Sequence, residues 1–133
     1  MSQCIAVLMA VNFIISGQPN NDHEKLKGSW KIVVWRVNGK DGAHSDKGKF
    51  VISDKEITFT DADDSLTYCI DASKKPKSID LRNTKSAECM AGIYAIDGNE
   101  LTLCLRHASF ERPDSFEYRP GGGPVFFLKL RRE

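Results

Sequence analysis

Four polar side chains are the best candidates for ligand recognition: Tyr68, Arg106, Glu111 and Arg112. A guanidinium group holds a carboxylate through two parallel hydrogen bonds, so the two arginines suit an acidic head group. We therefore interpret Arg106 and Arg112 as anchors for such a group at the mouth of a binding cavity. The alternative is a latch, in which Arg112 bonds carboxylate or carbonyl groups at the rim of a barrel while Pro113 stiffens its loop and Phe116 plugs it.

No arrangement typical of catalysis or metal binding stands beside these residues. The three histidines, His23, His44 and His107, are scattered without the spacing that brings two imidazoles to one metal ion. The sequence contains no G-x-S-x-G nucleophile elbow. We therefore predict no metal, no cofactor and no enzymatic activity.

Composition favours one globular domain with no polyelectrolyte partner. The 133 residues are 41% hydrophobic and 28% charged, which is enough for a packed core. A formal net charge of +1 gives no strong field to attract nucleic acid. No apolar run reaches the roughly 18 residues of a spanning helix, so we expect no integral membrane association. Oligomeric state is left open.

The N-terminal segment differs sharply in composition from the rest of the chain. Residues 4–15 read CIAVLMAVNFII, and no Asp, Glu, Lys or Arg precedes Asp22. With Ser16-Gly17 following, this pattern predicts a signal peptide over 1–17, a linker over 18–25 and a domain over 26–133. The protein would then be periplasmic or secreted. The alternative, which the absence of Lys and Arg from residues 1–3 keeps open, is a buried N-terminal strand or helix of a cytoplasmic protein.

The remaining chain reads as a series of short strands. Alternating or β-branched apolar runs are separated by turn residues, and only a short helical turn is expected, near Asp22 to Lys27. An antiparallel all-β domain hides its apolar faces by closing into a barrel or by folding into a sandwich. The eight predicted strands cover residues 30–37, 49–52, 56–60, 66–70, 78–81, 90–96, 100–105 and 125–131.

Two local features carry register predictions. Asp97-Gly98 predicts a type I′ hairpin in which Ile96 pairs with Asn99. Cys89 and Cys104 then lie on a diagonal, about 7 Å apart at Cβ, and form no disulfide.

Strict alternation along the first strand places Trp30 on the core face. Trp35 falls on the opposite face, where it is either covered by the N-terminal segment or exposed as an interface.

Gly28-Ser29-Trp30 before the first strand resembles the G-x-W signature of lipocalins, in which a basic residue of the last strand lies across the Trp. We assign that role to Arg131, with Arg132 as the alternative, so that Trp30 and Arg131 close the barrel. The chain over about 25–132 resembles a lipocalin-like family of uncharacterised exported proteins of planctomycete bacteria. The motifs that carry the wider resemblance are LKGSWK at 26–31, VNGK at 37–40, KPKSIDL at 75–81, GIYAIDGNELTLC at 92–104 and ERPDSF at 111–116.

The resemblance implies a single small eight-stranded antiparallel barrel, often behind a signal or lipoprotein leader, with no established activity. No lipobox cysteine stands near residue 17. We expect either a small apolar or amphipathic ligand inside the barrel, or a structural or protein-interaction domain whose barrel is filled. The predicted interior residues are Trp30, Ile32, Phe50, Ile57, Phe59, Leu66, Tyr68, Leu101, Leu103, Leu128 and Leu130.

Overall fold

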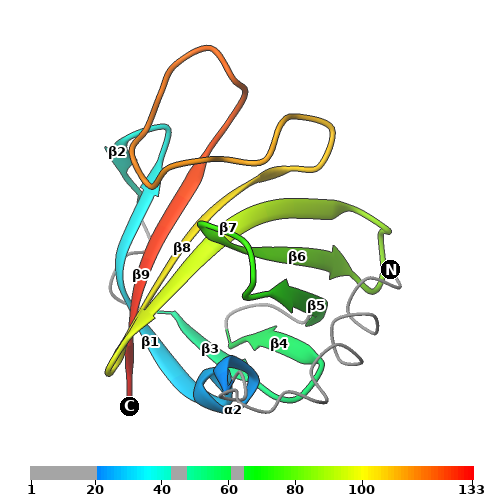
Figure 1. The fold of residues 1–133 in the computed structure, drawn as a ribbon, viewed down its shortest axis with the longest axis vertical. Coiled ribbons are helices and arrows are strands. Elements are labelled where there is room, and N and C mark those ends of the chain that lie inside the picture. Colours follow the sequence, from blue (N-terminus) through cyan, green and yellow to red (C-terminus); the bar gives the residue numbers. More distant parts are fainter. Residues whose placement is uncertain (1–20, 43–47, 61–64) are drawn as a thin grey trace.

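The computed structural model of the chain describes residues 21–42, 48–60 and 65–133. The predicted signal peptide, 1–17, lies outside the described residues, and the described part of the predicted linker forms most of a short helix. Figure 1 shows the elements, which are α2 (Asp22–Leu26), β1 (Gly28–Val37), β2 (Lys40–Asp41), β3 (Lys49–Ile52), β4 (Glu56–Phe59), β5 (Ser65–Asp71), β6 (Lys77–Asn83), β7 (Cys89–Asp97), β8 (Glu100–His107) and β9 (Phe126–Arg132).

The strands form a closed antiparallel barrel. From β3 to β9 each strand pairs with the next, and β1 closes the wall by pairing with both β3 and β9. The predicted eight-stranded antiparallel barrel with a short N-terminal helical turn is therefore confirmed. The short β2, which pairs only with the end of β1, is an additional strand that the sequence pattern did not predict. No helix in the described ranges is long and apolar enough to cross a lipid bilayer.

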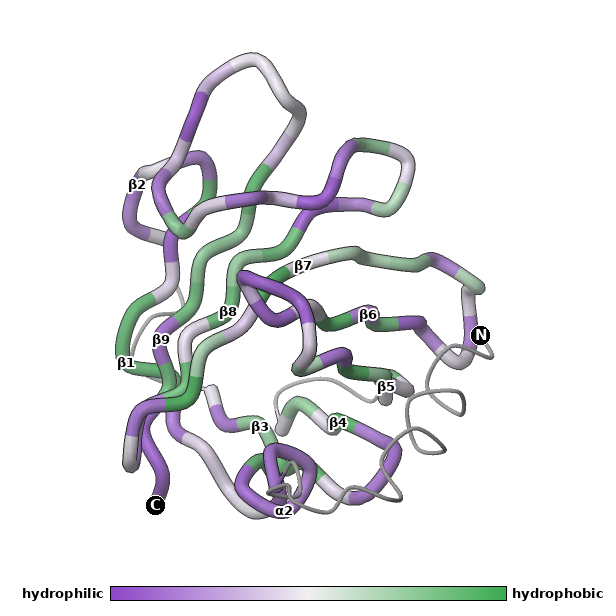
Figure 2. The backbone as a smooth tube through the Cα atoms, in the orientation of Figure 1, coloured by the Kyte–Doolittle hydropathy of each residue, from purple (hydrophilic) through white to green (hydrophobic). Residues whose placement is uncertain are grey.

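One hydrophobic core occupies the barrel interior. All eleven predicted interior residues belong to this core or pack against it. The core also contains Ile52, Ile79 and Tyr94, which the prediction omitted. Figure 2 shows hydrophobic stretches along β1, β8 and β9 and hydrophilic ones in the turns between strands. Fourteen buried side chains in one cluster indicate that packing inside the wall is the main stabilising contribution.

A β-bulge in β1 corrects the prediction for Trp35. The register against β9 shifts between Ile32 and Val34, so that Trp35 stands opposite the inward-facing Leu128. An extra residue in one strand reverses which face the following side chains occupy. Trp35 packs against the core, with its ring centroid 6.4 Å from that of Phe126. The placement of Trp35 on the outer face is therefore wrong.

The β7–β8 hairpin has a different register from the predicted one. Asp97 pairs with Glu100, and Gly98-Asn99 forms the two-residue loop. Gly98 has φ +61° and occupies the first central position, the place of glycine in a type II′ turn. This moves the pairing by two residues from the type I′ prediction. Cys89 and Cys104 are free thiols, as expected, although the register used to argue it was wrong.

Candidate functional site

The long loop between β8 and β9, residues 108–125, covers part of the outer face of the barrel. Cys104 alternates with the inward-facing Leu103 and Leu105 and therefore points outward. Outside the wall, Ile93, Cys104 and Val125 are buried together, and Phe116 packs against them. The loop thus builds a second, smaller hydrophobic cluster on the outside of β7 and β8.

Arg112 fastens the long loop to the wall. Its Nη1 donates hydrogen bonds to the carbonyl oxygens of Ile79, at 3.1 Å, and Gly92, at 2.9 Å. Its Nη2 forms an ion pair with Asp80 Oδ1 at 2.8 Å. Pro113, the next residue, is buried. Arg112 therefore acts as the latch of the alternative interpretation, but its partners lie within β6 and β7 rather than at the barrel rim.

Beneath the loop lies a cavity of about 310 Å³, which we call the loop pocket. It gathers three of the predicted ligand-binding residues, Arg106, Glu111 and Arg112. The prediction placed them at the mouth of the barrel, but Arg106 alternates with inward residues of β8, so the pocket lies outside the wall. Its lining is Cys104, Arg106, Glu111, Arg112, Pro113, Asp114, Ser115, Glu117, Arg119, Pro120, Gly121, Gly122 and Val125.

Arg106 is the least compensated arginine of the loop pocket. Its Nη1 donates one long hydrogen bond, 3.4 Å, to the carbonyl oxygen of Glu111. Its Nε is buried and has no hydrogen-bond partner among the described residues. By contrast, Arg112 pairs with Asp80 and Arg119 pairs with Asp114 at 3.3 Å. A buried donor without an acceptor is costly and is usually met by water or a ligand.

The glycine run before β9 shapes the wall around Arg106. A Cβ on Gly122 would lie 2.6 Å from Arg106 Nη2, so only a residue without a side chain allows the guanidinium to lie there. The neighbouring Gly121 and Gly123 have φ of +96° and +92°. These φ values explain glycine at 121 and 123, and the close approach of Arg106 explains it at 122. The run Gly121-Gly122-Gly123 is the sequence signal for this close approach.

Cys104 forms part of the floor of the loop pocket. Burial raises the pKa of its thiol, and the nearby charge of Arg106 only partly offsets that effect. The thiol is therefore protonated near neutral pH, and a protonated thiol is a poor nucleophile. No group of three or more His, Cys, Asp and Glu side chains is gathered to hold a metal ion in the part of the chain that the structure describes.

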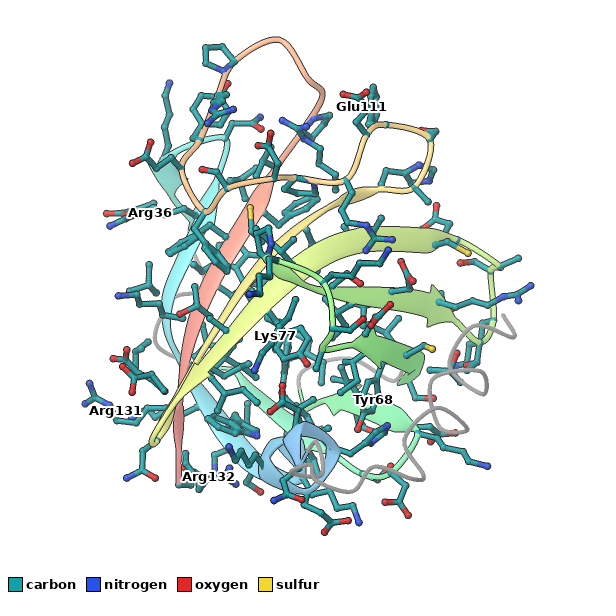
Figure 3. All side chains as sticks on the ribbon, viewed as in Figure 1. Arg36, Tyr68, Lys77, Glu111, Arg131 and Arg132 are labelled. Atoms are coloured by element: carbon teal, nitrogen blue, oxygen red, sulfur yellow. The ribbon has the colours of Figure 1, made fainter. Side chains whose placement is uncertain are left out.

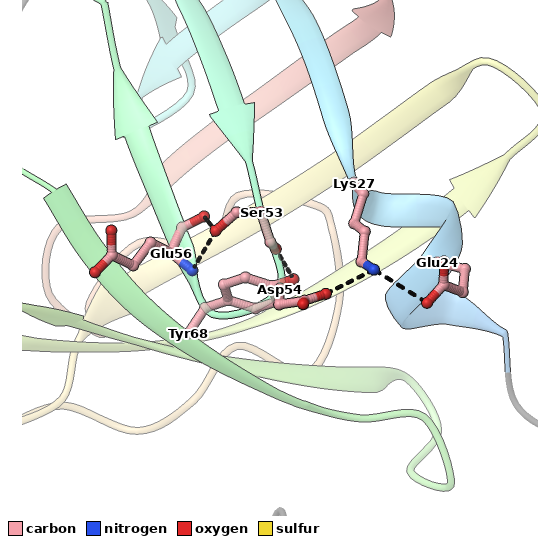
Figure 4. A network of polar contacts seen from close by, with 6 residues as sticks. All are labelled: Glu24, Lys27, Ser53, Asp54, Glu56 and Tyr68. Atoms are coloured by element: carbon pink, nitrogen blue, oxygen red, sulfur yellow. Dashed lines mark hydrogen bonds and ion pairs between the residues drawn. The ribbon is translucent and has the colours of Figure 1, made fainter.

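Tyr68, the fourth predicted ligand-binding residue, lies apart from the loop pocket. Its hydroxyl donates to the carbonyl oxygen of Ser53 at 2.7 Å, and burial raises its pKa to about 12. Figure 4 shows the surrounding network, in which Lys27 pairs with Asp54 at 2.6 Å and with Glu24 at 3.1 Å. Tyr68 therefore ties β5 to the turn between β3 and β4, and Lys27 ties the end of α2 to the same turn.

A second hollow runs along β5 and β6, with a volume of about 560 Å³. Tyr68 and Arg112, both predicted ligand residues, contribute to its lining. Its other basic residues, Lys74 and Arg82, are exposed to solvent. Exposed charges are already hydrated. Lys74 and Arg82 therefore do not share the buried, unpartnered nitrogen of Arg106.

At the opposite end of the molecule, the barrel base is closed by Trp30 and Arg132. Figure 3 shows Arg132 far from Glu111 of the long loop. The guanidinium carbon of Arg132 lies 4.2 Å from the Trp30 ring centroid. The Trp30 indole donates to the carbonyl oxygen of Leu26 at 2.8 Å. Arg131, the predicted closing residue, points outward with 63% of its side chain exposed, so the assignment to Arg131 is corrected to Arg132.

A buried carboxylate completes the base. Asp22 of α2 is 4% exposed, and its Oδ2 accepts hydrogen bonds from Tyr94 Oη at 2.8 Å and Lys77 Nζ at 2.9 Å. Burial raises the pKa of Asp22, but the bonds from Lys77 and Tyr94 and nearby positive charges lower it more, so the net pKa is below its usual value. The three groups connect α2 with β6 and β7.

Comparison with known proteins finds no match for this chain. No family model matches the chain, and neither the curated proteins nor the solved structures give a match.

Proposed function

We propose that this protein is a non-catalytic binding module that takes a small molecule in the loop pocket, outside the barrel. The observation that carries the proposal is the cavity beneath the latched loop, with a half-buried arginine that has no carboxylate partner among the described residues. Its volume of about 310 Å³ is near the lower end of ligand pockets, roughly 300–1,000 Å³. The module therefore suits a compact ligand.

The barrel interior is the less suitable place for this ligand. Trp30, Ile32, Leu101 and Leu130 are all 0% exposed, and they belong to one packed cluster. An eight-stranded barrel is just wide enough for its own side chains to fill. Absence of catalysis is part of the proposal, and the raised pKa of the Cys104 thiol supports it.

The same proposal includes a lipocalin-like kinship and export of the protein. The position of Arg132 over Trp30, next to the Gly28-Ser29-Trp30 motif, supports the kinship. The apolar segment 1–17 is the basis for export to the periplasm or medium. A mature N-terminus at Gln18, measured by mass spectrometry of protein from a secreting host, is the expected result. Retention of Met1 in the exported fraction would contradict it.

Mapping of small probes by NMR tests the binding function. Benzoate, benzamide and benzylamine have nearly the same shape and differ in charge, so they form a matched set. We expect at least one of them to shift the amide resonances of Arg106, Glu111 and Val125 in a saturable manner. Shifts confined to core residues such as Leu103 would place the ligand in the barrel and refute the loop pocket. No saturable shift with any probe would refute the binding function.

A second candidate function is a protein-interaction domain with a filled barrel. The packed core favours it, since such a domain needs no internal cavity. In that case the three probes leave the loop pocket resonances unchanged, while a protein partner captured by the long loop is lost when 108–125 is replaced by a Gly-Ser linker. The two candidates therefore give opposite results in the same NMR experiment.

A further inference from the structure

The charge balance of the loop pocket points to a particular class of ligand. Its lining contains the arginines Arg106, Arg112 and Arg119, and two of them are paired with Asp80 and Asp114. Of these three arginines, only Arg106 has no carboxylate partner among the described residues. A half-buried guanidinium without a carboxylate partner gains most from an oxyanion, because charge-assisted hydrogen bonds are about twice as strong as neutral ones.

The rest of the lining limits how much negative charge a ligand can carry. Glu111 and Glu117 also line the pocket, and both are exposed. Arg112 and Arg119 are already paired, so a dianion such as a dicarboxylate would find only Arg106 without a carboxylate partner, and the carboxylates of Glu111 and Glu117 would repel it. A single carboxylate on Arg106 keeps the attraction and limits the repulsion.

The floor of the pocket is apolar. Cys104 and Val125 are 1% and 4% exposed, and Pro113 beside them is buried. These side chains belong to or adjoin the small cluster outside the wall, so their positions are fixed by packing. An apolar group on the ligand would gain about 25 cal/mol for each Å² that it removes from water. The floor therefore favours a short hydrocarbon or aromatic portion.

We infer that the loop pocket is a site for a small monocarboxylate with a short apolar portion, held by Arg106 through its carboxylate. This inference rests on the proposed function and names the ligand class for the same pocket. Gly122 fixes the position of the guanidinium, because its backbone lies against the charged group. The nearby thiol of Cys104 stays neutral and adds no competing charge.

Titration with the matched probes tests the ligand class. We expect benzoate to bind the full-length protein about tenfold or more tightly than benzamide or benzylamine, with a dissociation constant of about millimolar for so small a molecule. Succinate, the dianionic probe, should bind more weakly than benzoate. Equal affinity for benzoate and benzamide would overturn the inference while leaving the proposed binding function intact. Failure of all three aromatic probes would remove both.

Substitutions identify Arg106 as the anchor. Arg106→Gln should weaken benzoate about tenfold or more and leave benzamide unchanged, while Arg106→Lys, which keeps the charge, should retain part of the affinity. Arg119→Gln is the matched control, because Arg119 lines the same pocket but is 64% exposed. Equal loss in Arg119→Gln and Arg106→Gln would overturn the assignment to Arg106.

The variant Gly122→Ala tests whether the position of the Arg106 guanidinium matters, without changing the charge of the pocket. In Gly122→Ala the new methyl group would lie 2.6 Å from Arg106 Nη2, and the flexible end of the arginine can move aside. We expect benzoate affinity to fall several-fold while the thermal midpoint stays nearly unchanged. Unaltered benzoate affinity in a folded Gly122→Ala protein would contradict the proposed pose, whatever the stability of the Arg106 variants.

Discussion

The barrel base and the loop pocket each contain a partly buried arginine, and the two arginines differ in how well their charge is compensated by partners. Arg132 at the base stacks on Trp30 at 4.2 Å and donates to the carbonyl oxygens of Lys27, at 2.9 Å, and Lys25. Arg106 in the loop pocket has one long hydrogen bond of 3.4 Å and a buried Nε without a partner among the described residues.

The difference separates a residue that completes the fold from one that is available for binding. The stacking and hydrogen bonds of Arg132 offset the free-energy cost of taking its charge out of water, so the base is stable as it stands. The cost at Arg106 is not offset within the described protein. We therefore expect the base to control the free energy of unfolding and the loop pocket to control ligand affinity, with little overlap.

The largest expected effect on stability is at the centre of the base. Trp30→Ala removes a side chain that is 0% exposed and packed in the main core. Large-to-small core substitutions of this kind cost about 3–5 kcal/mol. Urea unfolding followed by circular dichroism should show this loss in the midpoint. A loss below about 1 kcal/mol would show that the base does not control stability.

The next largest loss of stability is expected at Arg132, whose guanidinium lies over the Trp30 ring. Arg132→Met keeps the apolar stem but removes the cation–π contact and the carbonyl bonds, so we expect a loss of about 1–3 kcal/mol. The neighbour Arg131, 63% exposed, is the matched control, and Arg131→Met should change stability by less than about 0.5 kcal/mol. Similar losses for the two variants in urea unfolding would undo the distinction between them.

The buried carboxylate of Asp22 predicts that the stability of the protein depends on pH. The net pKa of Asp22 is lowered in the folded protein, so its contribution to stability is present above the unfolded pKa of 3.8 and is lost as the pH falls through the lower folded pKa. Asp22→Asn should cost about 1–2 kcal/mol at pH 7 and flatten the acid limb of the stability curve. Tyr94→Phe, which keeps the charge pair with Lys77, should retain most of that limb. Parallel acid limbs in Asp22→Asn and the unmodified protein would contradict this assignment.

The smallest stability effect is expected in the loop pocket. Arg106→Met replaces an uncompensated cation with an apolar side chain of similar length, and such replacements are often neutral or stabilising. We expect a change within about 0.5 kcal/mol of the unmodified protein, or slightly higher stability. A loss comparable to that of Arg132→Met would mean that Arg106 is a structural residue, and the contrast between the two sites would fail.

The alternation of side chains along β9 is sufficient to identify the residue that closes the barrel base. Leu128 and Leu130 of β9 face the core, and period-2 alternation places Arg132, not Arg131, on the same face. The correct closing residue therefore followed from the sequence pattern. The same alternation failed for Trp35, because a bulge in β1 adds one residue and leaves no clear mark in a strand that is apolar on both faces.

Turn dipeptides, too, predict the structure at one place and fail at another. Asn38-Gly39 directly follows β1, and the two residues adopt φ of +55° and +82°, as a type I′ turn requires. For the β7–β8 hairpin, Gly98 took the first central position of the loop with Asn99 as the second. Two adjacent pairs of residues were each able to form a tight turn, and only the pairing of the whole strands selects between them.

The loop pocket was predictable in its residue types but not in its location. Arg106 and Arg112 were identified from their chemistry, and they do line one cavity. Residues 108–125 have no periodic pattern, so nothing in the sequence indicates that the loop folds back over the outer face of β8. The latch of Arg112 on Ile79 and Gly92 joins segments 33 and 20 residues apart along the chain, and such contacts depend on the completed barrel.

Pairing of β1 with β9 has a practical consequence for handling the protein. The last residue, Glu133, is tied to the first strand by a backbone hydrogen bond to Ser29 at 3.0 Å. Figure 1 shows this end of the chain and the long loop at opposite ends of the molecule. A tether attached behind Glu133 would therefore anchor the protein to a sensor chip or bead with its ligand-accepting side turned toward the solution.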